Sequence, residues 1–270
     1  MRHTIVCFHA HPDDEALLMG GTMARLSAQG HRVVLVTATA GEAGLASAEL
    51  AARQPLGERR GHELTAAAHA LGCARAVLLG FADSGMAEHP STAPNAFSRT
   101  PVPAAAVALA QLLAEEDAGV LTIYDPAGGY GHPDHVQVHR AGLHAAALAG
   151  TPVVLEATVD RRALQRALRV VRPFTRGSAD LRPSRFDDLF ADPSRITHRV
   201  DVTGFLDQKR AAMQAHASQM TADGDAPRIL SRLLQLPVTV FRLAMGREWF
   251  VEHGRTPTRK RLDDVLATLR

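Results

Sequence analysis

Two short polar runs in this chain combine the residue types that bind metal ions and transfer protons. The first run, HPDDE at residues 11–15, directly follows the apolar, β-branched residues 5–8. The second run, GHPDH at 131–135, follows another apolar stretch more than a hundred residues later. Burying two adjacent aspartates beside histidines without a counter-charge would cost several kcal/mol, so a bound cation is the simplest explanation. Histidine and carboxylate ligands together suit zinc or a similar first-row divalent metal.

Both runs lie where a strand is expected to end, and this placement brings them together. In an open parallel sheet, ligands bind just outside the carboxyl ends of the strands, so both motifs reach one edge of the sheet. Apolar stretches alternating with helical patterns predict an α/β fold: a Rossmann-like, mostly parallel sheet flanked by helices on both faces. The expected strands are residues 5–8, 32–39, 76–81, 119–124 and 152–158.

The remaining segments are expected to form helices, one edge strand and one long loop. Helical patterns cover 15–29, 49–71 with a break near Pro55, 102–116 and 136–149, and a last amphipathic helix is expected from 259. We expect one α/β domain over residues 1–270, with an edge strand at 197–205 and a C-terminal portion, 160–270, that the pattern defines less well. The Pro- and Ser-rich segment 84–103 is long for a connection, so it is a candidate lid or acceptor-binding segment, and a mobile surface excursion is an equal alternative.

Composition and charge argue against several classes of protein. The 30 Lys and Arg barely exceed the 28 Asp and Glu, and the arginines form no stripe, so no nucleic-acid surface is expected. The N-terminus turns polar too early for a signal peptide, and charge or proline interrupts every long apolar run. We therefore expect no membrane association and a cytoplasmic protein. Cys7 and Cys73 are expected to be reduced, buried thiols.

The two polar runs together resemble the motifs of the PIG-L family of metal-dependent N-acetylglucosaminyl deacetylases. Secondary matches at 41–44, 60–64, 83–86 and 215–219 extend the similarity over residues 4–220. The family includes the deacetylase and the conjugate amidase of mycothiol metabolism, bacillithiol deacetylases and glycopeptide-antibiotic tailoring enzymes. The resemblance implies a hydrolase that removes an acetyl or similar acyl group from the amine of an N-acetylglucosamine-type sugar in a small-molecule glycoconjugate.

The resemblance also implies which residues hold the metal and which moves the proton. His11, Asp14 and His135 match the family's metal ligands. Zinc is the expected ion, and ferrous iron suits the same ligands. Asp13 matches the general base that takes a proton from the water activated by the metal.

Three further residues match positions that support the reaction. His132 would stabilise the tetrahedral intermediate as an imidazolium and donate a proton to the leaving amine. Asp134 would orient His132, and Tyr130 would donate a hydrogen bond to the oxyanion from a glycine-rich loop. The residues that match the family's sugar-contacting positions are Glu42, Arg60 and Asp83.

Several alternatives stay open at this point. Asp13 or Asp14 could simply cap the following helix, and His135 with His139 is a rival metal pair. A dinucleotide site is disfavoured because the first turn lacks the G-x-G-x-x-G pattern, and no G-x-S-x-G elbow indicates a serine hydrolase. Within the family, an amidase of thiol conjugates and a catalytically silent metal-binding homologue both remain. The sequence gives no oligomeric state.

Overall fold

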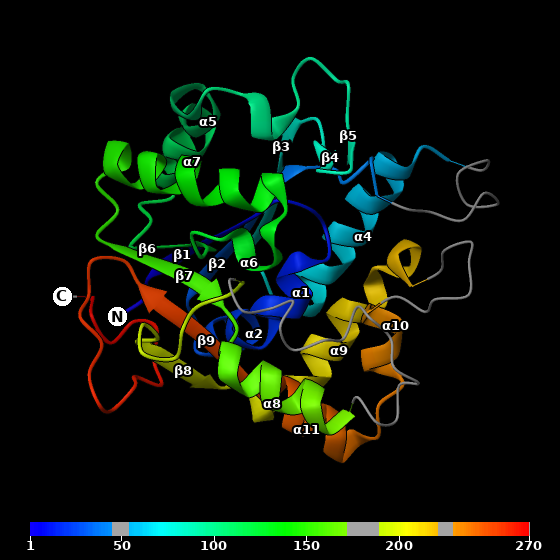
Figure 1. The fold of residues 1–270 in the computed structure, drawn as a ribbon. Helices are drawn as coiled ribbons and strands as arrows, with labels where there is room; N and C mark the ends of the chain where they lie inside the picture. Colours follow the sequence, from blue (N-terminus) through cyan, green and yellow to red (C-terminus); the bar gives the residue numbers. More distant parts are fainter. Residues whose placement is uncertain (45–53, 172–188, 221–228, 270) are drawn as a thin grey trace.

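A seven-stranded sheet forms the centre of the molecule (Figure 1). The computed structural model describes residues 1–44, 54–171, 189–220 and 229–269. Across the sheet the strands run in the order β3-β2-β1-β6-β7-β9-β8; the first five are parallel, and β9 is antiparallel to both of its neighbours. The predicted, mostly parallel α/β sheet is confirmed. The strands are β1 (Thr4–His9), β2 (Arg32–Thr39), β3 (Arg75–Phe81), β6 (Val120–Tyr124), β7 (Val153–Thr158), β8 (His198–Asp201) and β9 (Arg247–Glu252).

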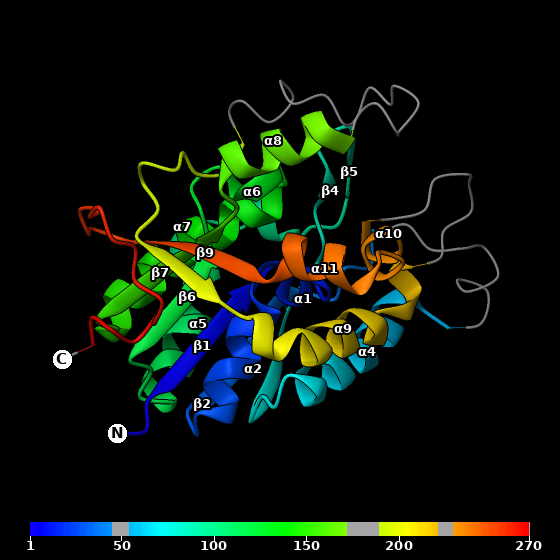
Figure 2. The ribbon, with the colours of Figure 1, turned by 90° about the horizontal axis from the view of Figure 1, so that it is seen from below.

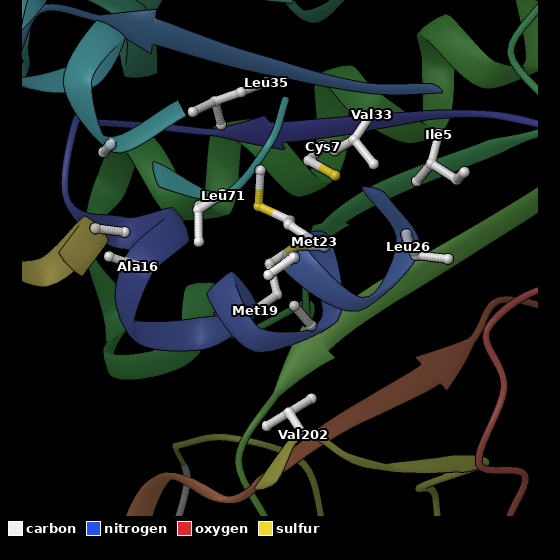
Figure 3. Packing of buried hydrophobic residues seen from close by; sticks show 14 of the residues in the cluster. Ile5, Cys7, Ala16, Met19, Met23, Leu26, Val33, Leu35, Leu71 and Val202 are labelled. Carbon is white, nitrogen blue, oxygen red and sulfur yellow. The ribbon is translucent and has the colours of Figure 1, made fainter. Parts of the chain in front are cut away.

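Side-chain alternation along the inner strands divides the core into two apolar layers. On β1, Ile5 and Cys7 point into one layer, and Val6 and Phe8 point into the other. Figure 3 shows the first layer, in which Met19, Met23 and Leu26 pack against the sheet. Helices therefore cover both faces, as predicted. The first layer is covered by α1 (Asp14–Leu18), α2 (Gly20–Ala28), α4 (Leu56–Ala70) and α9 (Leu206–Ala215), and the second by α5 (Val102–Glu115) and α7 (Pro133–Ala149).

The helix expected over 15–29 is wrong in one respect, because it is broken at Met19 into α1 and α2. A new helix start needs acceptors for its first N–H groups. Here Glu248 of β9 accepts hydrogen bonds from Gly21 N at 2.9 Å and Thr22 N at 2.7 Å. The carboxylate that allows the break lies more than two hundred residues away in the sequence, so local periodicity could not reveal it.

The amphipathic helix expected from 259 is also wrong. Leu262 N donates to Thr197 O at 3.0 Å, and Leu262 O accepts from Arg199 N at 2.8 Å, so this segment pairs with the outer edge of β8. Its backbone hydrogen bonds go to the sheet instead of to a helix. The edge strand expected at 197–205 is confirmed as β8, although it ends at Asp201 and is followed by a 3-10 turn, η5 (Thr203–Phe205).

The segment 84–103 has a buried residue, Phe97, that packs in the core, and an exposed stretch at 86–90. It contains the short hairpin β4 (Gly85–Met86) and β5 (His89–Pro90) and the 3-10 turn η1 (Phe97–Arg99). Phe97 is fully buried in the second apolar layer, whereas residues 86–90 are exposed. Part of the predicted helix 49–71 lies outside the described residues, and α4 begins directly after Pro55.

The C-terminal part of the chain continues the same sheet and packs beside the N-terminal helices. Figure 2 shows α9 alongside α4, while β8 and β9 extend the sheet beyond β7. No helix in the described residues is long and apolar enough to cross a membrane. The remaining elements are α6 (Gly128–Gly131), α8 (Arg161–Val171), η6 (Ala217–Gln219), α10 (Ile229–Leu234) and α11 (Val238–Met245).

Candidate metal centre and active site

The turn after β1 is built around a left-handed residue, Asp13. Its φ of 113° is rare for any residue other than glycine and costs about 1–3 kcal/mol. Asp13 occupies the N-cap position of α1, yet its side chain makes no capping hydrogen bond. The alternative in which Asp13 serves only as a helix cap is therefore wrong, and its carboxylate is free for another role.

The two adjacent aspartates contact different partners. Asp14 Oδ2 accepts the backbone N–H of His11 at 3.0 Å and lies 3.4 Å from His11 Nδ1 and 3.3 Å from His135 Nε2. Asp13 Oδ1 instead lies 3.3 Å from the buried guanidinium of Arg60. The carboxylate of Asp14 thus contacts both histidines, while that of Asp13 contacts Arg60.

Glycines shape the second turn, between β6 and α7. Gly128 has a φ of 65°, and a Cβ there would lie 2.7 Å from the backbone nitrogen of Val136. The turn delivers His132 to the N-cap of α7, where its Nδ1 accepts the backbone N–H of Asp134 at 3.1 Å. Because Nδ1 is an acceptor, the neutral ring carries its proton on Nε2.

Three buried carboxylates surround His11. Its Nε2 lies 3.2 Å from Asp134 Oδ2 and 3.5 Å from Asp83 Oδ1, while Asp14 faces its Nδ1. Burial alone would lower the pKa of His11, but these three carboxylates raise it well above its usual value. Burial would likewise raise the pKa of Asp14, but His135 and His11 hold it well below its usual value. This concentration of buried negative charge calls for a cation.

Two of the separations between donor atoms fit a divalent metal ion. Two ligands about 2.0–2.1 Å from a tetrahedral zinc lie about 3.3–3.4 Å apart, which matches the separations of Asp14 Oδ2 from the two histidine nitrogens. Both ring nitrogens of His135 and Oδ1 of Asp134 are buried without a hydrogen-bond partner in the part of the chain that the structure describes. Buried polar atoms are normally satisfied, so the unpaired Nε2 of His135 fits a role as a metal ligand.

Among the described residues, two groups of metal-ligating atoms lie within 4.8 Å of one another, and His11 belongs to both. Asp14 and His139 are in neither group, although Asp14 Oδ2 lies close to nitrogens of both His11 and His135. The rival pair of His135 with His139 is disfavoured because His139 Nδ1 lies 3.0 Å from the carbonyl oxygen of Tyr124. The two groups are His11, His132 and His135, and His11, Asp83 and Asp134.

Two tyrosine rings hold the imidazole of His135 in place. Tyr124 stacks on it with ring centroids 4.2 Å apart and planes within 7°, and Tyr130 meets it edge-on at 4.9 Å. Tyr130 is 47% exposed, so it lies at the solvent-exposed side of His135. The role of Tyr124 was missed, because an aromatic residue at a strand end reads as core.

The structure corrects the expected partners of Asp134 and His132. The carboxylate of Asp134 contacts His11 and accepts the backbone N–H of Ser84 at 2.9 Å, so it orients His11, and only its backbone N–H reaches His132. Burial, followed by the charges of His11 and His135, lowers the pKa of His132 to about 4. An imidazolium at His132 would also lose the Nδ1 hydrogen bond, so this geometry favours a neutral ring that donates from Nε2, and the imidazolium stays a prediction.

The three predicted sugar-contacting residues lie near one another but differ in exposure. Arg60 is buried, and its guanidinium donates to the carbonyls of Pro12 and of Gly41, the latter at 2.7 Å. This position makes it a brace for the Asp13 turn, and its contact with a sugar stays a prediction. Asp83 is buried beside His11, while Glu42 is exposed at the rim and accepts the backbone N–H of Asp83 at 2.8 Å.

A second buried pair beneath the Asp13 turn was not predicted to have a role. Glu15 Oε1 lies 2.5 Å from His216 Nε2, and both residues are fully buried. His216 belongs to the 215–219 match to the family, and this match was the one signal in the sequence. Because the two residues are separated by two hundred positions, nothing local pairs them.

The fold and the site together define an α/β protein with a candidate metal centre of histidines and aspartates at the carboxyl edge of its parallel strands. The model of the GlcNAc-PI de-N-acetylase family, PIG-L, matches residues 6–146. This span includes both polar runs. The chain belongs to the PIG-L family.

Relatives similar to this chain are named as deacetylases of an inositol-linked amino sugar. The 1D-myo-inositol 2-acetamido-2-deoxy-alpha-D-glucopyranoside deacetylase of Mycobacteroides abscessus is 38% identical, covering 87% of this chain and 88% of the relative. The protein of the same name from Nocardiopsis dassonvillei is 36% identical, covering 93% and 97%. The similarity therefore spans nearly the full length of both relatives.

Solved structures share the fold at lower identity. The A40926 pseudoaglycone deacetylase Dbv21 aligns with a TM-score of 0.61 at 20% identity, covering 96% of this chain and 100% of that one. GalB, a 4-carboxy-2-hydroxymuconate hydratase from Pseudomonas putida KT2440, aligns with a TM-score of 0.56 at 17% identity, covering 96% and 99%. Because this fold carries two kinds of reaction, the reaction must be argued from the site residues.

Proposed function

We propose that this protein is a metal-dependent N-deacetylase that hydrolyses the acetamide of an N-acetylglucosamine-type sugar in a small-molecule glycoconjugate. Membership of the PIG-L family and relatives at 36–38% identity that are named as such deacetylases support this proposal. The observation that carries it is the arrangement at the end of β1. Asp14 joins two histidines, while the adjacent Asp13 stands free of them as a candidate base.

His11, Asp14 and His135 would hold the ion, with zinc as the proposed metal and ferrous iron as the alternative. A bound divalent ion supplies Lewis acidity, which polarises the amide carbonyl and lowers the pKa of water. This ligand set provides one carboxylate and two imidazoles, which leaves a net positive charge at the metal. His132 is left out of the set because its Nδ1 is already occupied and its Nε2–H is a donor.

The chain's own residues would move the protons. Burial raises the pKa of Asp13 to about 6, partly offset by Arg60, so its carboxylate is a stronger base than an exposed aspartate. Asp13 accepts a proton from water as the new C–O bond forms, and then passes it to the amide nitrogen as the C–N bond breaks. Acetate and a free amine leave. His132 Nε2–H and the hydroxyl of Tyr130 would donate hydrogen bonds to the developing oxyanion.

The proposed substrate is an N-acetylglucosamine joined to a polyol such as inositol, which is the class named for the relatives. Glu42 at the rim and Asp83 beside it would accept hydrogen bonds from sugar hydroxyls. The exposed residues 86–90 of the hairpin follow closely after Asp83 in the sequence, and we propose that they border the part of the substrate beyond the sugar. We also keep the single domain over 1–270 and the cytoplasmic location as proposals.

Amine release from a panel of N-acetylated compounds tests the proposal. Purified protein is incubated with N-acetylglucosaminides carrying different aglycones, and fluorescamine measures free amine before chelation, after chelation, and after addition of zinc or, without oxygen, ferrous iron. The proposal expects release that chelation stops and one of the metals restores. Release only from an amide of a thiol conjugate would favour the amidase, and metal binding without release from any compound would favour a silent homologue.

A further inference from the structure

We propose that the buried pair of Glu15 and His216 is a positioning device for Asp13, which holds the left-handed turn that aims the Asp13 carboxylate away from the metal ligands. Its catalytic consequence rests on the proposed function, in which Asp13 is the general base. Its geometric content does not depend on that function, because it concerns the backbone of one residue.

One carboxylate joins the end of α9 to the turn after β1. Glu15 Oε1 lies 2.5 Å from Nε2 of His216, the C-cap residue of α9, and Glu15 Oε2 accepts the backbone N–H of Asp13 at 3.0 Å. Both Glu15 and His216 are fully buried. Hydrogen bonds to a buried carboxylate are stronger than neutral ones, so this chain of contacts can resist local strain.

The strained turn directs the carboxylates of Asp13 and Asp14 to different surroundings. Asp14 must face His11 and His135, whereas a base must keep its carboxylate off the metal ligands and open to water. The left-handed φ at Asp13 separates the two adjacent side chains. A residue outside its preferred backbone region stays there only where its surroundings hold it from more than one side.

The turn is held from two sides. Arg60 braces one side by donating to the carbonyl of Pro12 and contacting Asp13 Oδ1 at 3.3 Å. Glu15 holds the other side through the N–H of Asp13. Loss of the Glu15 acceptor would remove the hydrogen bond of this partly buried N–H, which is one of the two contacts that hold the turn.

Neither Glu15 nor His216 is placed to bind the metal or the substrate. Neither belongs to a group of candidate metal ligands in the described residues, and full burial keeps both from a substrate. Nδ1 of His216 has no hydrogen-bond partner there, so the ring's side-chain hydrogen bond goes to Glu15 alone. They are positioning residues rather than catalytic ones.

The test compares two substitutions at one position with a matched control. Glu15→Gln keeps an oxygen that can accept the Asp13 N–H, while Glu15→Leu removes it at similar volume. Ser218→Ala is the control, because it removes a buried 2.6 Å hydrogen bond to Glu63 from the segment that directly follows His216. Measured for each are kcat, KM, bound zinc, and the increase in unfolding temperature when zinc is added to metal-free protein.

The expected result is a specific loss of kcat. Glu15→Leu lowers kcat at least about tenfold, while KM and zinc binding are retained. Glu15→Gln keeps most of the wild-type kcat. Ser218→Ala lowers the unfolding temperature but leaves kcat unchanged. In the Asp13→Asn background, Glu15→Leu causes no further loss of kcat, because it acts through Asp13. An equal loss in that background, or equal rates for the Gln and Leu variants, would overturn the proposal.

Crystal structures of the two variants decide the geometric claim even if no substrate is found. Residue 13 is expected to leave the left-handed region in Glu15→Leu and to stay near its φ of 113° in Glu15→Gln. A left-handed Asp13 in Glu15→Leu would refute the positioning role. A wild-type protein that releases no amine would count against the proposed function alone.

Discussion

Truncation of Glu248 is expected to destabilise the protein more than any surface change. Its carboxylate accepts hydrogen bonds from Lys209 Nζ at 2.5 Å and from the backbone nitrogens of Gly21 and Thr22, and it is 2% exposed. Glu248→Leu would leave the 1% exposed Lys209 as an uncompensated buried cation, which costs about 3–5 kcal/mol. Loss of the acceptor for the start of α2 adds about 1 kcal/mol.

Urea unfolding followed by circular dichroism at pH 7 measures this loss. A total of about 4–6 kcal/mol is a large part of the stability of an ordinary domain, about 5–15 kcal/mol. The double variant Lys209→Met with Glu248→Leu is therefore expected to be more stable than Glu248→Leu alone, because no charge is left buried. A loss below about 1 kcal/mol in Glu248→Leu, or a double variant less stable than the single one, would refute the reasoning.

Substitutions at His198, Asp13 and Gly142 test the titration, the catalysis and the packing in turn. Burial, followed by the charge of Arg255, lowers the pKa of His198 to about 4, so at this site the unfolded chain binds more protons between about pH 4 and 6.5 and stability falls as pH falls. Urea unfolding at pH 5 and 7 should show a loss that is about 2 kcal/mol smaller in His198→Gln than in the wild type, and an equal loss in both would contradict this. Asp13→Asn should keep its zinc by metal analysis while kcat falls about 10²–10⁴-fold, whereas His135→Ala should lose the zinc; a fully active Asp13→Asn would remove the assigned base. Gly142→Ala, whose Cβ would lie 2.4 Å from Ile123 Cγ2, should cost about 1–3 kcal/mol by thermal unfolding, and an unchanged midpoint would contradict the packing.

The sequence predicted those parts of the fold that depend on local pattern. Runs such as 32–39 are apolar throughout because both faces of the strand are covered, and the same reasoning placed both polar runs at one sheet edge. The contacts of Asp14 with His11 and His135 agree with that placement.

Local pattern could not predict features that depend on distant partners. The break at Met19 depends on Glu248, and the absence of a helix after 259 depends on the open edge of β8. The carboxylate of Asp134 faces His11 because it accepts the backbone N–H of Ser84, fifty residues earlier in the loop after β3. In each case a tertiary hydrogen bond outweighed the local preference.

Titration of metal-free protein with zinc, with bound metal and amine release measured in the same samples, tests the central claim most directly. The site at His11, Asp14 and His135 predicts that amine release from an N-acetylglucosaminide rises with bound zinc and levels off at about one equivalent, and that Asp14→Ala shows neither binding nor release. Ferrous iron added without oxygen distinguishes the two candidate metals. Full activity in metal-free protein, or unchanged zinc binding in Asp14→Ala, would contradict the account.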